Sequence, residues 1–122
     1  MSPFVQEMHT KTGLIHEITN GGAQLSLISE DLCSLLDMQG VMNKSPLCGS
    51  TVHFDRSFIK RFLPAVHGRL HYRNVDVSSF KELVMRWCPE EQQWVKKDQH
   101  RALPDIYESI KELRYYRSIF GL

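Results

Sequence analysis

The alternation of strand and helix patterns between residues 46 and 87 constrains the fold of this chain most strongly. Residues 46–49 are a short apolar run bounded by turn residues, which predicts a buried strand. A second strand is predicted over 70–77, where β-branched and aromatic residues gather. A helical pattern follows each strand, over 58–63 and over 79–87. This order predicts an α/β domain with helices packed on a small sheet.

Three further helices are predicted outside this region. Apolar residues recur at helical spacing over 24–37, and Gly40 ends that helix. A serine followed by a proline predicts a short helix over 3–9. The best helical pattern covers 106–120, with Gly121 as its C-terminal cap. The residues that this last helix is expected to bury are Ile106, Ile110 and Leu113.

The composition limits the kinds of partner that the chain can bind. A length of 122 residues predicts one domain, with 42% hydrophobic and 24% charged residues as in an ordinary soluble protein. The formal net charge of +1 argues against a protein that grips long nucleic acid through a broad basic surface. A small anionic ligand held by a few well-placed groups is compatible with this charge.

The cysteines indicate a reducing environment. Cys33, Cys48 and Cys88 are odd in number, lie among apolar residues and lack metal-ligand spacing, which predicts buried, reduced thiols in an intracellular protein. No apolar run reaches the roughly 20 residues that span a bilayer, so no membrane association is expected. The N-terminus shows no signal-peptide pattern, although removal of a targeting segment after import stays open.

Two residues near the last helix suggest catalytic chemistry. His100 and Asp105 lie five positions apart, so on one helix they would point roughly 140° apart. We therefore expect His100 on the preceding loop and Asp105 in the first helical turn, with Pro104 as the first helical residue. This arrangement places a histidine of suitable basicity beside a carboxylate.

A third candidate, Asp55, follows the first predicted strand and a loop over 50–53, and it opens the next helix. Taken alone, Asp55 is more simply an N-cap, while His100 and Asp105 are a loop histidine and a first-turn acid. Together, the three side chains would meet at one end of the sheet, where α/β proteins place their sites.

The chemistry that suits these three residues is metal-assisted hydrolysis of a phosphodiester. Asp55 and Asp105 would hold divalent cations that activate water and stabilise the leaving oxygen. His100 would act as the general base. Oxygen ligands favour Mg²⁺ or Mn²⁺ over zinc.

Three separated segments carry a family resemblance. Residues 45–55 read SPLCGSTVHFD, residues 71–83 read HYRNVDVSSFKEL, and residues 100–105 read HRALPD, followed by ESIKELRYYR over 108–117. In this order the segments resemble the oligoribonucleases of the DEDDh exonuclease superfamily. The resemblance is close over 44–120, and it is looser before residue 16.

The resemblance implies a ribonuclease H-like exonuclease fold and a homodimer that cuts short RNA oligonucleotides, especially dinucleotides, into mononucleotides in the 3′ to 5′ direction. Asp55 matches the acid of the family's second motif. His100 matches the general base, and Asp105 matches the last metal ligand, with Mg²⁺ or Mn²⁺ as the cofactor. The family's location is compatible with cytoplasm or mitochondrial matrix.

The resemblance also implies substrate-binding residues. His9 falls where the family has a histidine beside the substrate base, and Tyr72 and Arg73 fall where a neighbouring subunit completes the site. The residues expected near the terminal phosphate are Thr51, Arg73, Ser78 and Ser79. Without the resemblance, the alternating polar residues over 67–73 would indicate a solvated strand face, and Tyr72 a core or dimer contact.

One family motif, an Asp-x-Glu on the opening strand, has no counterpart in this sequence. Because Met1 aligns with an interior position of the family, we expect residues 1–122 to form a single, partial exonuclease domain with an N-terminally truncated fold and an incomplete sheet. The expected activity is therefore weak or absent. The alternatives are a non-catalytic dimerisation or short-RNA-binding module, or a fragment without independent function.

Overall fold

The computed structural model describes residues 24–97 and 100–122. It contains two compact units, one formed by residues 23–82 and the other containing residues 83–122. The predicted helix over 3–9 and the candidate His9 lie outside the described residues. The single domain over 1–122 stays a prediction.

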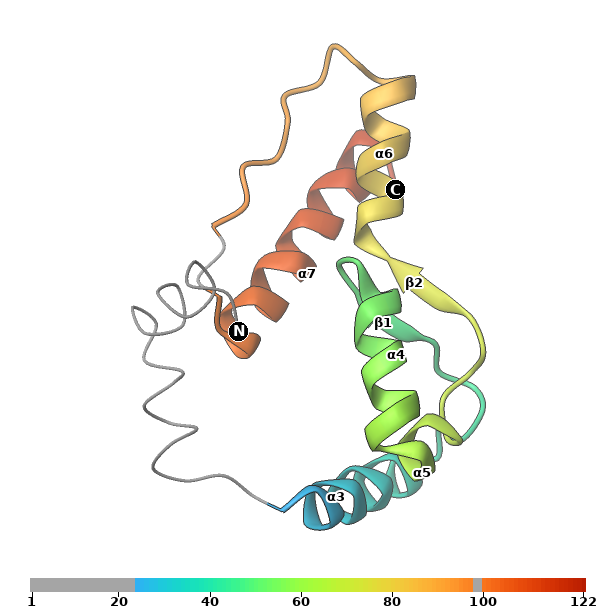
Figure 1. The fold of residues 1–122 in the computed structure, drawn as a ribbon. Helices are drawn as coiled ribbons and strands as arrows, with labels where there is room; N and C mark the ends of the chain where they lie inside the picture. Colours follow the sequence, from blue (N-terminus) through green and yellow to red (C-terminus); the bar gives the residue numbers. More distant parts are fainter. Residues whose placement is uncertain (1–23, 98–99) are drawn as a thin grey trace. The chain divides into compact units, whose positions relative to one another are not determined.

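The 23–82 unit is an α/β arrangement around two parallel strands, as predicted (Figure 1). The strands pair in parallel with Leu47 opposite Asn74 and Gly49 opposite Asp76. Both strands therefore end at the same edge of the sheet, and each runs into a helix there. The elements are α3 (Leu25–Met38), β1 (Leu47–Gly49), α4 (Val52–Phe62), α5 (Pro64–His67), β2 (Asn74–Asp76) and α6 (Val77–Trp87), whose last turns continue beyond residue 82.

Helix α3 matches the predicted helix over 24–37 closely. It ends because Gly40 adopts a left-handed backbone with φ of 65°. The amide of Gly40 donates to the carbonyl of Asp37 at 3.1 Å, and the amide of Val41 donates to that of Leu36 at 3.5 Å. This pair of bonds is a Schellman ending, which satisfies carbonyls that the helix itself leaves unpaired.

The boundaries around both strands differ from the prediction. Strand β2 covers only Asn74–Asp76, because a turn precedes residue 70, with Leu70 N donating to His67 O at 3.1 Å, and residues 70–73 are irregular. The His71 amide donates to Ser45 O at 3.0 Å, outside the paired residues of the two strands. The predicted loop over 50–53 is also wrong in part, since α4 already begins at Val52. The β propensity of residues 70–73 was thus overridden by hydrogen bonds to residues outside the paired strands.

Strand β1 is not buried as predicted, because Cys48 is exposed and its two strand neighbours are only half-buried. The prediction of a buried thiol is therefore wrong for Cys48, whereas Cys33 is buried and Cys88 is half-buried. All three thiols are free. An apolar run bounded by turns indicates a strand but does not show how many layers cover it.

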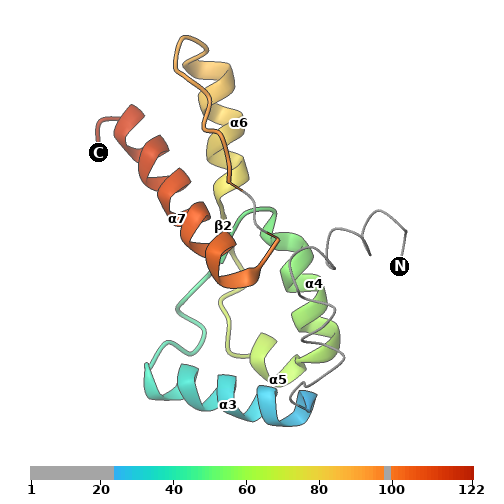
Figure 2. The same cartoon turned by 90° about the vertical axis from the view of Figure 1, so that its left-hand side faces the viewer.

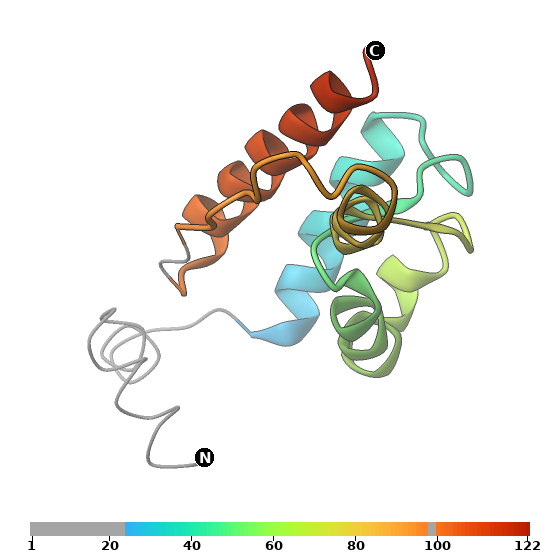
Figure 3. The ribbon, with the colours of Figure 1, turned by 90° about the horizontal axis from the view of Figure 1, so that it is seen from above.

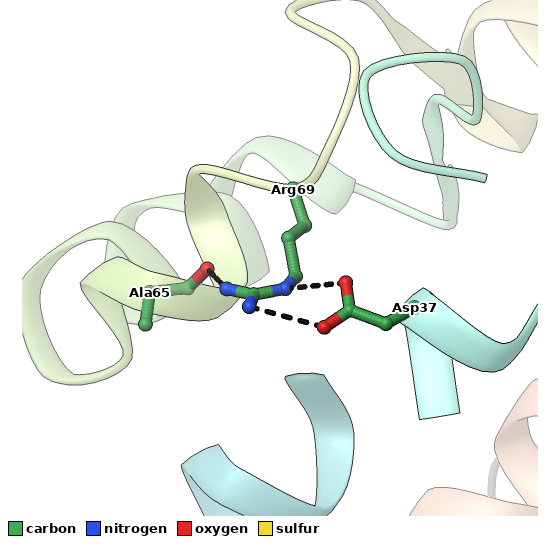
Figure 4. A network of polar contacts seen from close by, with 3 residues as sticks. All are labelled: Asp37, Ala65 and Arg69. Carbon is green, nitrogen blue, oxygen red and sulfur yellow. Dashed lines mark hydrogen bonds and ion pairs between the residues drawn. The ribbon is translucent and has the colours of Figure 1, made fainter. Parts of the chain in front are cut away.

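A bidentate ion pair joins the ends of α3 and α5 (Figure 4). The Arg69 guanidinium donates to the two carboxylate oxygens of Asp37 at 2.9 and 3.2 Å and to the Ala65 carbonyl at 2.9 Å. The hydrogen bond from Arg69 holds the pKa of Asp37 below its ordinary value. Helix α5 packs against both α3 and α4 in this unit (Figure 2).

The other unit contains α7 (Ala102–Ile119), one uninterrupted helix (Figure 3). Pro104 is its third residue rather than its first. Its end matches the prediction, since Gly121 has a left-handed φ of 74° and Leu122 N donates to Arg117 O at 3.2 Å. None of the helices in the described part of the chain is long and apolar enough to cross a membrane.

The predicted buried face of α7 is wrong. Ile106 is 54% exposed and Ile110 is 42% exposed, while Leu113 is half-buried. The pattern identifies the apolar face of a helix but not what covers that face. The residues of α7 that are buried are Glu108, Ser109, Glu112 and Tyr116.

Candidate functional site

The predicted site residues are divided between the two units. His100 and Asp105 belong to the unit that contains α7, and His9 is outside the described residues. Convergence of Asp55 with His100 and Asp105 therefore stays a prediction. The predicted site residues in the 23–82 unit are Thr51, Asp55, Tyr72, Arg73, Ser78 and Ser79.

The carboxylate of Asp76 organises the edge of the sheet at which α4 and α6 begin. Its Oδ1 accepts the backbone amides of Thr51 and Ser78, each at 2.9 Å, and its Oδ2 accepts that of Val52 at 3.3 Å. Burial alone would raise the pKa of Asp76, but these hydrogen bonds together with the Ser78 hydroxyl lower it below its ordinary value. One carboxylate thus caps the starts of two helices.

This arrangement brings two predicted phosphate-binding residues together. Thr51 Oγ1 lies 3.3 Å from Ser78 Oγ, and Thr51 N lies 3.2 Å from the same hydroxyl. Thr51 has a left-handed backbone with φ of 55°, which turns the chain sharply from the sheet edge into α4. Because the Ser78 hydroxyl also bonds Asp76, Thr51 Oγ1 is the hydroxyl of this pair that can donate to an anion, and Ser78 Oγ helps to hold it in place.

Asp55 is an exposed residue in the first turn of α4, and Thr51 occupies the N-cap position. The simpler interpretation of Asp55 as an N-cap is therefore wrong. A carboxylate in the first turn is stabilised by the helix dipole. Its exposure leaves the oxygens accessible to a cation.

Arg56 is a second organising residue in the 23–82 unit. Its Nε donates to Asn74 Oδ1 at 2.7 Å, and one terminal nitrogen donates to the carbonyls of His71 at 2.7 Å and Arg73 at 3.2 Å. The other terminal nitrogen lies 3.3 Å from His67 Nε2. One guanidinium therefore holds the backbone on both sides of Tyr72.

Tyr72 and Arg73 form an exposed aromatic and cationic pair. The Tyr72 side chain is 74% exposed, which rules out a core role within the described structure. The Arg73 guanidinium carbon lies 5.3 Å from the centre of the Tyr72 ring, and the His71 ring stacks at 4.5 Å from the same ring. Such a stack is suited to contact a base or a phosphate. The predicted strand face over 67–73 is wrong, because these residues do not form a strand.

His100 precedes α7, as predicted. It is exposed and has a left-handed φ of 54°, a conformation that histidine adopts more readily than most residues. Asp105 is half-buried in the first turn, where its amide donates to the Arg101 carbonyl at 3.0 Å. Loop histidine and helix-borne acid are thus both in the local positions that the sequence predicted.

Among residues 24–97 and 100–122, no group of three or more histidine, cysteine, aspartate or glutamate side chains is placed to hold a metal ion. A divalent cation needs about six oxygen ligands, some of which are usually water. The two acids Asp55 and Asp105 would supply only part of that set.

Sequence reasoning missed Asp76 and Arg56, which hold the candidate binding residues in place. A signal was present for Asp76, because an acid two residues before a serine at a strand-to-helix boundary is typical of a cap. Arg56 carried no comparable signal. Its partners lie 11 to 18 positions away in the chain, and only the fold brings them together.

Comparison with known proteins identifies the family. A model of the exonuclease family matches residues 1–113. The oligoribonuclease of Leifsonia xyli subsp. xyli is 45% identical over 119 residues, covering 96% of this chain and 58% of the relative. That of Chromobacterium violaceum is 40% identical over 121 residues, covering 98% of this chain and 67% of the relative.

A mitochondrial oligoribonuclease of Bos taurus is 40% identical over 120 residues, covering 97% of this chain and 51% of the relative. The chain thus spans between about half and two thirds of the length of these relatives. The predicted resemblance is confirmed. With a family model that matches most of its length, this chain belongs to the oligoribonuclease group of the exonuclease family.

Proposed function

We propose that this chain acts on short RNA as a 3′ to 5′ exoribonuclease that releases mononucleotides, with dinucleotides as its main substrates. The exonuclease family match over residues 1–113 carries this proposal. The names of the relatives support the choice of short RNA as substrate. We expect weak or no hydrolysis from the chain alone, because the sequence has no Asp-x-Glu pair to complete the metal ligands beside Asp55 and Asp105.

The proposed catalytic residues are Asp55, His100 and Asp105. The exonuclease family uses divalent metals, and Mg²⁺ or Mn²⁺ is the proposed cofactor, since carboxylate oxygens suit these ions. Asp55 and Asp105 are the proposed ligands, and further oxygen ligands are required beside them. The exposed His100 is the proposed general base, because an imidazole can take a proton from water near neutral pH.

The edge of the sheet is the proposed site for the terminal phosphate of the RNA. In a dinucleotide bound with its 3′ end at the catalytic residues, the 5′ end lies close by. A site that binds the 5′-phosphate at that distance would therefore favour short substrates. The Thr51 and Ser78 hydroxyls, 3.3 Å apart, support this assignment, and the exposed Ser79 follows them. Hydroxyl donors with a guanidinium bind a phosphate dianion better than an internal diester.

We also propose that the chain forms a homodimer in which Tyr72 and Arg73 complete the site of the neighbouring subunit. The exposure of Tyr72 and its stacking with Arg73 support this role. His9 is the proposed contact to the substrate base. The proposed location is the cytoplasm or the mitochondrial matrix, and the name of the bovine relative supports the second.

The alternative is a non-catalytic dimerisation or short-RNA-binding module. The absence of an Asp-x-Glu pair from the sequence favours this alternative. It predicts binding of a dinucleotide without hydrolysis at any metal concentration.

Detectable hydrolysis of a 5′-phosphorylated dinucleotide with Mn²⁺ would support the exoribonuclease and rule out the non-catalytic module. We expect any turnover to fall by about 100-fold or more in His100→Ala and Asp105→Ala, as is usual on loss of a general base or a charged ligand. Asp31→Ala, a change of an exposed acid on α3, is the matched control and should keep wild-type turnover. Unchanged turnover in both site variants would remove the catalytic assignment.

A further inference from the structure

We propose that Arg56 is a positioning residue that holds residues 71–74 in the conformation that presents Tyr72 and Arg73 to the end of a short RNA. This inference rests on the proposed function, because Tyr72 and Arg73 are assigned there to substrate binding. Arg56 itself does not need to touch the RNA. Its role follows from the contacts that it makes within the 23–82 unit.

The contacts of Arg56 are placed on both sides of Tyr72. The guanidinium donates to the carbonyl before Tyr72, that of His71, and to the carbonyl after it, that of Arg73. Its Nε anchors the Asn74 side chain, at the first residue of β2. A planar guanidinium has five N–H donors in a fixed arrangement, and a lysine ammonium cannot reproduce that arrangement.

This segment needs such an anchor because it has no strand pairing of its own. Residues 71–73 precede β2 and lie outside the residues that pair in the two-stranded sheet. Backbone carbonyls without partners are costly when solvent is partly excluded, and Arg56 supplies donors for two of them. On the other side of the segment, the His71 amide donates to Ser45 O at 3.0 Å.

The anchored segment displays three stacked side chains. Arg73 N donates to His71 Nδ1 at 3.1 Å, which folds the segment tightly around Tyr72. The His71 and Arg73 side chains then lie against the Tyr72 ring, which is itself 74% exposed. An ordered aromatic ring with a cation beside it binds a nucleotide without first losing conformational entropy.

The experiment compares Arg56→Gln and Arg56→Lys with the wild-type chain by amide hydrogen exchange. Arg61→Gln is the matched control, because Arg61 is on the same helix and its guanidinium lies over the Phe62 ring, 5.2 Å from its centre. We expect exchange over 71–76 to become at least about tenfold faster in both Arg56 variants, while α3 and the control keep wild-type rates. Asn74→Ala, which removes one contact only, should give a smaller increase in the same segment.

Binding provides the second readout. The probe is a dinucleotide with and without a 5′-phosphate, titrated against each variant. We expect Arg56→Gln to weaken binding of the phosphorylated probe by about tenfold, because Arg73 is no longer held in place to make its charge-assisted contact with the phosphate. The loss should be smaller for the unphosphorylated probe. The control variant should bind both probes like the wild type.

Wild-type exchange rates over 71–76 in Arg56→Gln would overturn the proposal. It would also be overturned by faster exchange throughout residues 24–82, since that result means a general loss of stability. If Arg56→Gln fails to fold, the exchange rates of Asn74→Ala take its place. Faster exchange confined to 71–76 would support the proposal, and wild-type rates there or faster exchange throughout 24–82 would overturn it. If the wild-type chain binds neither probe, the proposed function fails, while the exchange data still decide whether Arg56 holds the segment.

Discussion

The 23–82 unit and helix α7 of the other unit hold their site residues by different kinds of interaction. In the 23–82 unit, the side chains of Asp76 and Arg56 fix the backbone directly beside Thr51, Tyr72 and Ser78. These contacts are complete within the unit. The local geometry of the proposed phosphate site therefore depends on few residues, all of which are described.

On helix α7, polar side chains are buried and large apolar side chains are exposed. Its buried residues include Glu108, Glu112 and Tyr116, whereas Ile106 and Ile110 are exposed. Asp105 lies in the first turn of this helix. Polar contacts between segments far apart in the sequence thus fix the backbone of the binding groups in the 23–82 unit, whereas the apolar face of α7 is left exposed.

The largest effect is expected from loss of the Asp76 carboxylate. Asp76→Ala removes the acceptor of three backbone amides at two helix starts. We expect the free energy of unfolding to fall by about 2 kcal/mol, in line with the loss of helix caps. Urea denaturation measures this change, with Asp31→Ala as the control. A loss below about 0.5 kcal/mol would show that the amides find other acceptors.

The same carboxylate predicts a dependence on pH. Its pKa is lowered in the folded chain, so it stabilises the fold above its ordinary pKa of 3.8, and this contribution is lost as the pH falls through the lower folded value. The difference in stability between the wild type and Asp76→Asn should therefore shrink on going from about pH 7 to about pH 2. A constant difference over this range would contradict the role of the charge.

A smaller effect is expected from the buried pair on α7. Burial raises the pKa of Tyr116, and so does its hydrogen bond to Glu112, with Tyr116 Oη donating to Oε2 at 2.8 Å. Tyr116→Phe leaves that carboxylate without this donor, which should cost about 1 kcal/mol. Hydrogen exchange across α7 measures the loss.

The adjacent variant Tyr115→Phe is the control for this prediction. Its hydroxyl donates to the Gln92 carbonyl in an exposed contact, and water can replace that bond. If both variants lose the same stability, burial does not make the Tyr116 hydrogen bond more important than the exposed one of Tyr115. That result would contradict the prediction.

Local patterns predicted much of the fold. The turn glycines and apolar spacing located α3, the end of α7 and both strands, because these features depend on neighbours within one or two turns. The start of α4 was not predictable in this way. Its cap comes from Asp76, whose partner Thr51 lies 25 positions earlier in the chain.

Side-chain burial and polar contacts between distant residues could not be predicted from the sequence. The apolar residues Ile106 and Ile110 form a recognisable face, but the pattern does not specify a covering surface. Likewise, Tyr72 and Arg73 were identified through family resemblance, whereas the residue that anchors them, Arg56, was not. Recognising Arg56 required the irregular segment that replaces the first half of the predicted second strand, because its carbonyls accept from Arg56.

The most direct test of the account is the affinity of this chain for a dinucleotide with and without a 5′-phosphate, measured for the wild type, Thr51→Val and Ser78→Ala. We expect the wild type to prefer the phosphorylated form and both variants to reduce this preference by about tenfold, while the unphosphorylated form binds as before. Equal affinity of the wild type for the two forms would contradict a phosphate site at the edge where α4 and α6 begin.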